Sequence, residues 1–172
     1  KARLIPLLDI LVGLPCVFID RDPQAALRRR VYGRAGEYRL PAHGVEYRTL
    51  SNFWLRNYQT MSLVMGLTRL AYAVLGTYKG AQLWIVDGFN GRYIVSDWDA
   101  EEELLQAVDL PSIQKAINKN NLELAQKCWE PIRAFIGEHV PDGSNGLDST
   151  NLDQFDYFCK KVQEYGLDYW FP

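Results

Sequence analysis

Apolar residues dominate the start of the chain and return in a second long block further along. Residues 2–19 are apolar on every side of a predicted helix, and Asp9 is the main polar break. The second block follows Ser51 and Asn52, which are good helix N-caps, and predicts a core helix from about Phe53 to Leu75 or Tyr78. Helices that are apolar all round are buried, so we expect these two to form the centre of the molecule.

The region between the two blocks predicts a β-hairpin. Apolar and charged side chains alternate in residues 37–40 and 45–50, which gives each strand one apolar face and one charged face. The intervening segment Pro41–Gly44 contains two turn formers. A loop of this length pairs Leu40 with Val45 and so defines the register of the two strands.

That register brings opposite charges together across the hairpin. Arg39 is expected opposite Glu46, and Glu37 is expected opposite Arg48. Such cross-strand pairs stabilise a hairpin locally, although exposed ion pairs contribute little to stability. Two ion-paired rungs on a surface hairpin are therefore the simplest interpretation of this charge pattern.

The rest of the chain is mostly helical in pattern. A short helix ends in Arg28–Arg30, which suits the negative end of the helix dipole. Residues 83–86 and 93–95 predict a second hairpin, and helices fill the remainder, with Pro131 expected to kink or split one of them and a last amphipathic helix at 151–165. The predicted fold class is α+β, with antiparallel hairpins packed against long helices and a helical C-terminal half.

Composition narrows the class of protein. The chain has 172 residues, is 48% hydrophobic and carries a formal net charge of −2, so it is one globular domain or a large piece of one, with no general attraction for nucleic acid. Three widely spaced cysteines argue against a disulfide framework or a structural zinc site and favour a reducing, cytoplasmic location. The two histidines, His43 and His139, offer little material for a histidine-based triad.

The arginines around the hairpin also allow a more specific interpretation. Arg34, Arg39 and Arg48 each present a planar fork of donors that matches phosphate or carboxylate oxygens. Glu46 adds the hard oxygen ligand that Mg²⁺ prefers beside phosphate. If these four side chains share one concave face, they form one wall of a nucleotide and metal site.

The string YGRAGEYRLPAHGVEYRTLSNFWL resembles the signature of the carboxylate–amine ligases of the glutamine synthetase superfamily, and in particular the phage and bacterial amidoligase type 2 group, the phiEco32-like COOH·NH2 ligases. In glutamine synthetase an N-R-S-x-x-x-R strand precedes an E-x-R strand that leads into a helix beginning N-P-Y. Arg34 and Arg39 match the arginine spacing, VEYR supplies Glu46 and Arg48, and Asn52 opens the helix. The resemblance is strong over residues 8–75 and weak beyond Gly80.

The resemblance implies an ATP- and Mg²⁺-dependent reaction. ATP phosphorylates a carboxylate, an amine attacks the acyl-phosphate, and an amide and phosphate leave. Glu46 would be a ligand of the metal, Arg34 and Arg39 would contact the ATP phosphates, and Arg48 would bind the transferring phosphoryl group or the substrate carboxylate. Arg34 and Arg48 would be the catalytic arginines, and Arg30 lies close enough to the motif to be a further nucleotide contact.

The resemblance also implies that this chain is only part of the ligase. The family has an earlier strand with paired glutamates and an H-x-H-type strand, and neither pattern occurs in this sequence. We therefore expect residues 1–80 to be the C-terminal part of a glutamine synthetase-like catalytic domain, with residues 81–172 as a mostly helical extension packed on it. The chain is expected to be inactive without the missing N-terminal segment, on the same or a separate chain, in the cytoplasm of a bacterium or a phage-infected host.

Two other functions remain open at this point. The chain could be a non-catalytic binding or structural module that retains the arginine-rich hairpin. It could also bind nucleic acid through Arg28–Arg30 and the hairpin, but the isoelectric point of about 5.7 and the lack of an aromatic residue on the charged face argue against this. The expected partners are the missing segment and the carboxylate and amine substrates, with no nucleic acid and no membrane.

Overall fold

The computed structural model describes residues 3–20, 22–76, 85–87, 91–93 and 100–139, together with 157, 160–161 and 164–165. These residues are mostly helical and include two antiparallel hairpins, consistent with the predicted α+β class. The elements in chain order are α1 (Leu4–Leu8), the π-helical η1 (Asp9–Gly13), α2 (Leu14–Ile19), α3 (Ala25–Val31), β1 (Tyr38–Arg39), β2 (Glu46–Tyr47), the 3₁₀ helix η2 (Asn52–Leu55), α4 (Tyr58–Gly76), β3 (Ile85–Asp87), β4 (Gly91–Tyr93), α5 (Ala100–Ala107), α6 (Leu110–Lys119) and α7 (Leu122–His139).

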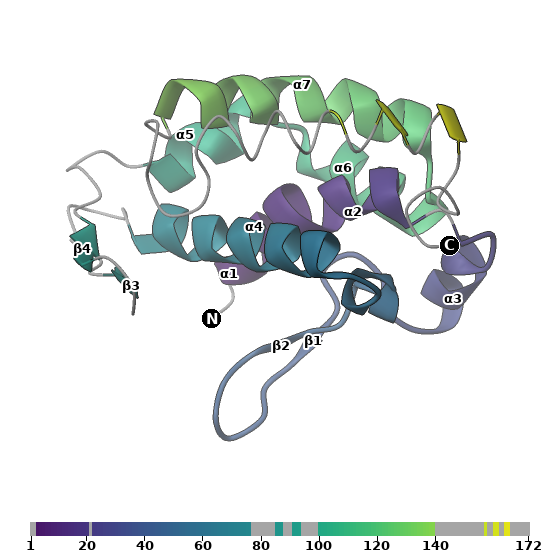
Figure 1. The fold of residues 1–172 in the computed structure, drawn as a ribbon, viewed down its shortest axis with the longest axis horizontal. Helices are drawn as coiled ribbons and strands as arrows, with labels where there is room; N and C mark the ends of the chain where they lie inside the picture. The colour runs from purple at the N-terminus through teal and green to yellow at the C-terminus, as the bar shows by residue number, and fades with distance from the viewer. Residues whose placement is uncertain are drawn as a thin grey trace.

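The first apolar block forms the middle layer of the molecule. The elements α1, η1 and α2 follow one another as an almost continuous helix between α4 on one side and α6 and α7 on the other (Figure 1). Residues as far apart as Leu7, Leu14 and Ile19 have no exposed surface. Neighbours on both sides explain why this segment is apolar all round, as the sequence predicted.

The second apolar block begins differently from the prediction. The predicted single helix from Phe53 is instead a 3₁₀ turn, η2, followed by α4 from Tyr58. The Ser51 hydroxyl accepts a hydrogen bond from the Phe53 N–H at 3.4 Å, and the Asn57 Oδ1 accepts one from the Thr60 N–H at 2.8 Å. Each short polar side chain caps its own helical start, so the chain turns twice before the core helix begins.

The hairpin of β1 and β2 has the predicted register. Tyr38 pairs with Tyr47, and Arg39 pairs with Glu46. The Gly44 N–H donates to the carbonyl of Pro41 at 3.1 Å, which closes the predicted four-residue turn. The hairpin projects from the helical layers (Figure 1), and the charged side chains of its two strands are partly or largely exposed.

The second predicted hairpin is also present, with strands that differ by a few residues from the predicted ones. Strand β3 pairs with β4 so that Val86 lies opposite Arg92. The two hairpins form separate two-stranded sheets, and no larger sheet is found within the residues that the structure describes.

The helices α6 and α7 pack on the middle layer and share its core. Ile113 and Ile117 of α6 and Ile132 of α7 have no exposed surface, and all belong to one hydrophobic cluster with the first helix. Of the two outcomes predicted for Pro131, a kink or a split, the split is wrong, because α7 continues through this residue. Trp129 and Ile132 both pack into the core on either side of Pro131, and this packing holds the two halves in one helix.

Two predictions fall largely outside the described residues. The last amphipathic helix at 151–165 does so except at five positions, and the proposed boundary between residues 80 and 81 lies within the undescribed stretch 77–84. The division at that boundary stays a prediction. Among the helices that are described, none is both long and apolar enough to cross a membrane.

Candidate functional site: the charged face of the first hairpin

The charged face of the β1–β2 hairpin consists of Glu37, Arg39, Glu46 and Arg48. Arg39 Nε lies 2.5 Å from Glu46 Oε2, and Arg48 Nη1 lies 3.5 Å from Glu37 Oε1, so both predicted rungs are confirmed. Arg48 Nε lies 3.7 Å from the other Glu46 oxygen. Glu46 therefore sits between two guanidinium groups on the same face, as the site hypothesis required of Arg39 and Glu46.

Tyr32 holds Arg48 in place. The Arg48 Nε–H donates to the Tyr32 hydroxyl at 3.0 Å, and the guanidinium carbon lies 4.1 Å from the centre of the Tyr32 ring. This hydrogen bond and the nearby carboxylates raise the pKa of Arg48 above its ordinary value. The expectation of no aromatic residue at the charged face is wrong, because Tyr32 comes from the segment before β1 and stacks on Arg48.

Arg34 is placed differently from the other predicted residues. Its guanidinium donates to the carbonyl oxygens of Arg29 at 3.3 Å and Arg30 at 2.9 Å, at the C-terminal end of α3. Its backbone N–H donates to Glu37 Oε2 at 3.1 Å. The structure thus joins Arg39, Glu46 and Arg48 by ion pairs and places the Arg34 side chain on α3, where Arg34 and Arg30 are both exposed. The nucleotide-binding roles of Arg34 and Arg30 stay predictions.

Glycine is required where the chain enters the hairpin. Gly33 has a φ of +79°, a left-handed conformation that other residues rarely adopt. A Cβ at this position would lie 2.7 Å from the carbonyl oxygen of Arg48. The Gly33 N–H donates to Glu37 Oε2 at 2.6 Å, so the close approach lets Glu37 bind the backbone with one oxygen and Arg48 with the other.

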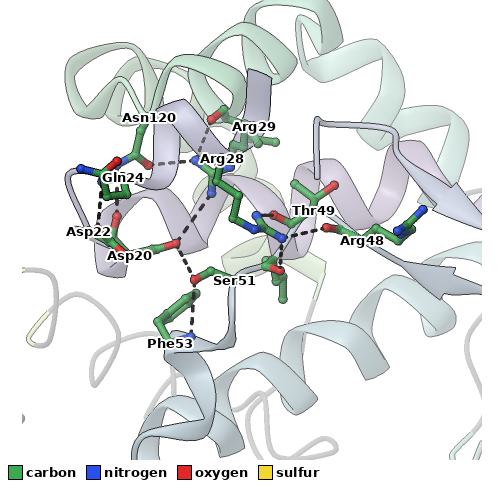
Figure 2. A network of polar contacts seen from close by, with 12 residues as sticks. Asp20, Asp22, Gln24, Arg28, Arg29, Arg48, Thr49, Ser51, Phe53 and Asn120 are labelled. Carbon is green, nitrogen blue, oxygen red and sulfur yellow. Dashed lines mark hydrogen bonds and ion pairs between the residues drawn. The ribbon is translucent and has the colours of Figure 1, made fainter. Parts of the chain in front are cut away.

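Arg28 holds the backbone of residues 48–50, directly after β2. Its guanidinium donates to the carbonyl oxygens of Arg48 at 3.2 Å, Thr49 at 3.1 Å and Leu50 at 2.8 Å (Figure 2). Three carbonyl partners use most of the donors of one guanidinium group. Arg28 is therefore a clamp on the backbone beside the charged face, whereas the sequence predicted a favourable helix C-terminus or a nucleic-acid contact for the arginine run.

Arg29 is buried beneath the same region. Its Nη1 donates to the carbonyl of Ile117 at 2.8 Å and to Asn120 Oδ1 at 3.0 Å, and its Nη2 lies 4.0 Å from Asp20 Oδ2. Desolvation lowers the pKa of Arg29, and the nearby Asp20 partly offsets this shift. The Asp20 carboxylate also accepts the Ser51 hydroxyl at 2.8 Å, so one buried ion pair connects α2, α3 and α6 with the start of η2 (Figure 2).

Asp9 supports the hairpin from below. It is fully buried, and its Oδ1 accepts hydrogen bonds from the Tyr47 hydroxyl at 2.6 Å and the Gly36 N–H at 2.9 Å. Its Oδ2 accepts one from Gln114 Nε2 at 3.1 Å. Burial raises the pKa of Asp9, and the three donors partly offset this shift. The sequence marked Asp9 as a polar break in an apolar helix, but it gave no indication of these partners.

The residues described do not form a Mg²⁺ site on their own. Within them no group of three or more acidic, histidine or cysteine side chains could hold a metal ion. Both oxygens of Glu46 face guanidinium groups, whereas a protein Mg²⁺ site offers oxygen ligands without competing cations. Arg39 and Arg48 are better placed, since their side chains are 65% and 26% exposed and can reach an anion from solvent.

Comparison with known proteins shows which family the chain belongs to. A family model described as "Phage phiEco32-like COOH.NH2 ligase-type 2" matches residues 1–138. The match continues well past Gly80, where the motif resemblance becomes weak. No curated protein and no solved structure matches the chain. Because the family model covers most of the sequence, the chain belongs to the phage phiEco32-like COOH–NH2 ligase family, type 2.

Proposed function

We propose that this chain takes part in ATP-dependent ligation of a carboxylate to an amine, and that the charged face of the hairpin binds the phosphoryl group in transfer. The observation that carries the proposal is the arrangement of Arg48. Its guanidinium is held by Tyr32, Glu37 and Glu46, yet remains partly exposed beside Arg39. A pre-oriented fork of donors next to a second guanidinium suits three phosphoryl oxygens.

The proposed reaction has two steps. A carboxylate oxygen attacks the γ-phosphorus of ATP, the bond to the bridging oxygen breaks, and ADP leaves. The amine nitrogen then attacks the acyl carbon, phosphate leaves with the C–O bonding pair, and the nitrogen loses a proton. Arg48 and Arg39 would offset the negative charge on the phosphoryl oxygens in both steps, which is positioning and electrostatic stabilisation without a covalent enzyme intermediate.

The proposal gives Arg34 and Arg30 supporting roles. Both side chains are exposed at the end of α3, next to the segment that carries Tyr32. The Arg34 guanidinium would exchange its carbonyl partners on α3 for nucleotide phosphate oxygens, which are stronger acceptors because they are charged. Such a movement needs no change in the hairpin itself, because the backbone N–H of Arg34 stays bonded to Glu37.

The proposal includes a role of Glu46 as a Mg²⁺ ligand. It would require further carboxylates from outside the described residues, supplied by an N-terminal segment on the same chain or on a partner. We accordingly assign no catalytic step to the metal. What Glu46 does within the described residues is to orient Arg39 and Arg48 through its two oxygens. A glutamine synthetase-like sheet, of which β1 and β2 would be two strands, belongs to the same proposal.

A second candidate function is a non-catalytic binding or structural module. The observation that favours it is the balance of charge on the face, where Glu37 and Glu46 each face a guanidinium. A face that is already neutralised binds anions weakly unless some of its ion pairs open. The two functions differ in whether Arg48 contributes to the binding of ATP and to product formation.

The proposal can be tested by measuring ATP binding and product formation with the full chain. Titration calorimetry measures ATP affinity with and without Mg²⁺. For product formation, ATP, a panel of carboxylates and hydroxylamine are supplied, because hydroxylamine attacks an acyl-phosphate to give a hydroxamate that forms a coloured iron(III) complex. ADP is measured in the same samples, so hydrolysis without ligation is recognised. Repeating the assay with a candidate N-terminal segment tests whether that segment completes the enzyme.

Arg48→Ala should reduce hydroxamate formation by about 100-fold if the guanidinium stabilises transition-state charge. Arg48→Lys should restore only part of this, since it keeps the charge but lacks the planar fork. The matched control is Arg133→Ala, because this side chain is exposed and belongs to α7, a helix that lies across the helical layers from the hairpin (Figure 1). If Arg48→Ala leaves both ATP affinity and product formation unchanged, the assignment of the site is wrong.

A further inference from the structure

We propose that Asp9 is a positioning residue for the charged face, because its carboxylate determines where β2 and the turn at Gly36 lie. The effect of Asp9 on catalysis rests on the proposed function, whereas its effect on the position of the hairpin does not. It concerns a buried acidic residue that makes no contact with the reacting groups and acts through Tyr47.

A single oxygen of Asp9 binds both sides of the hairpin. Oδ1 accepts from the Gly36 N–H, just before β1, and from the Tyr47 hydroxyl of β2. The second oxygen accepts from Gln114 of α6, so the carboxylate is anchored to the core at the same time. The hairpin is thus attached to the helical layers through one fully buried group.

The helix that carries Asp9 is shaped to receive Tyr47. Asp9 begins the π-helical segment η1, and the N–H of Leu14 donates back to the Asp9 carbonyl across that wider turn. Gly13 lies in the same segment, where a Cβ would come within 2.5 Å of the Tyr47 hydroxyl. The absence of a side chain at Gly13 therefore leaves room for the phenol to reach Asp9. Single π-helical turns occur often at functional sites.

Tyr47 transmits this attachment to the reacting side of the hairpin. Successive side chains of a strand point to opposite faces, so Tyr47 points inward while Glu46 and Arg48 point to the charged face. A buried apolar anchor would allow the strand to shift, whereas a hydrogen bond fixes both distance and direction. Displacement of Tyr47 moves both neighbours together, and small displacements of groups that bind a transferring phosphoryl group reduce the rate strongly.

The test compares two variants that each remove one hydrogen bond to Asp9. Tyr47→Phe removes the bond on the hairpin side and keeps the ring. Gln114→Ala removes the bond on the α6 side and serves as the matched control. Nuclear magnetic resonance of the full chain, without any ligand, follows the Arg48 Nε–H signal and the exchange of the Arg48 amide, which is bonded to the Glu37 carbonyl at 3.0 Å.

In Tyr47→Phe we expect the Arg48 amide to exchange roughly 5- to 10-fold faster, the factor that one lost hydrogen bond gives, with a shifted Arg48 Nε–H signal and unchanged amides in α6. In Gln114→Ala the two Arg48 signals should stay as in the unsubstituted chain. Equal changes in both variants, or no change at Arg48 in either, would overturn the proposal, because Asp9 would then be an ordinary buried contact.

Activity provides the second measurement. In the hydroxamate assay Tyr47→Phe should lower kcat roughly 10-fold with little change in the KM for ATP, since the phosphoryl-binding groups are displaced while the rest of the nucleotide contacts remain. A fall in kcat that Gln114→Ala shares equally would count against Asp9. Failure of the unsubstituted chain to form hydroxamate under any condition would count against the proposed function alone, because the Arg48 signals decide the role of Asp9 without substrate.

Discussion

Individual residues in this structure carry charge into places where charge is costly, and each buried charge has partners that explain it. Asp9 has no exposed surface and accepts three hydrogen bonds, and Arg29 is 2% exposed and lies beside Asp20. Burying a carboxylate or a guanidinium without such partners would strongly destabilise the folded chain. An exposed ion pair behaves differently from a buried one. The pair of Arg39 with Glu46 is expected to contribute little to the free energy of unfolding, so both side chains are available for function.

The pKa of Asp9 gives a prediction for the pH dependence of stability. Burial raises this pKa above its ordinary value of 3.8, so the folded chain binds the proton more tightly than the unfolded chain does. The contribution of Asp9 is therefore fully present below pH 3.8 and is lost as the pH rises through the raised pKa. Asp9→Asn removes this titration. We expect the free energy of unfolding of the unsubstituted chain minus that of Asp9→Asn to fall as the pH rises in urea titrations.

The comparison with Asp9→Asn cancels the titration of all other groups. A difference that is constant with pH would contradict the raised pKa, and a difference that grows with pH would mean that the three donors outweigh the cost of burial.

Gly33→Ala should destabilise the chain. The residue has a φ of +79°, and a Cβ would lie 2.7 Å from the Arg48 carbonyl oxygen. The expected loss in the free energy of unfolding is roughly 1–3 kcal/mol, measured by urea titration. Gly44→Ala is the control, because nothing lies within 4 Å of a Cβ there. Equal stability of the two variants would mean that the backbone at Gly33 relaxes freely.

At the scale of elements, the molecule attaches a small hairpin to a helical body. A two-stranded hairpin is only marginally stable alone, so its position depends on its attachments. Arg28 binds three carbonyl oxygens at the exit from β2, and Asp9 binds the entry to β1 and the side chain of Tyr47. Polar side chains also determine where the helices begin. The core helix α4 is capped by Asn57, whereas Ser51 caps the preceding 3₁₀ helix η2.

Asn57→Ala should weaken the start of α4. The side chain accepts the Thr60 N–H at 2.8 Å, and loss of such a cap costs about 1 kcal/mol. Asn57→Asp keeps an acceptor at the same place and should recover most of the loss. Thermal unfolding of the three proteins provides the comparison. If Asn57→Asp is as unstable as Asn57→Ala, the hydrogen bond to Thr60 is not the cause.

At the scale of the whole molecule, residues far apart in the sequence close one core. Arg29 of α3 donates to the carbonyl of Ile117, which is 88 positions later, and Gln114 of α6 donates to Asp9, which is 105 positions earlier. Arg29 and Asp20 together connect the middle layer, α3 and α6 (Figure 2). The folding of the hairpin region and of the C-terminal helices should therefore be coupled.

Arg29→Ala tests this coupling. Removing one member of a buried ion pair leaves the other uncompensated, so the expected loss is about 3–5 kcal/mol in the free energy of unfolding. The neighbouring Arg30→Ala is the control, because its side chain is exposed and a change within roughly 0.5 kcal/mol is expected. A single cooperative transition that is shifted as a whole in Arg29→Ala would support coupling, whereas separate transitions would contradict it.

The sequence by itself determined the features that depend on local periodicity and turn length. The all-round apolar pattern of the first segment identified a buried helix, and the four-residue turn with its alternating strands gave the register that pairs Arg39 with Glu46. Both follow from short-range geometry, because a period of side chains and a loop length are properties of neighbouring residues. The family motif was recognisable for the same reason, since its residues lie within one short string.

Only the tertiary structure decided which charges are free and which are internal. In the sequence, Arg28, Arg29 and Arg30 form one run of arginines at a helix end, but the structure makes Arg28 a backbone clamp, buries Arg29 and leaves Arg30 exposed. Asp9 is only a polar break in the sequence, but in the structure it accepts hydrogen bonds from Tyr47 and Gln114, which lie 38 and 105 positions away. Partners at such separations are determined by how the helices and the hairpin pack, and no local pattern of residues records that packing.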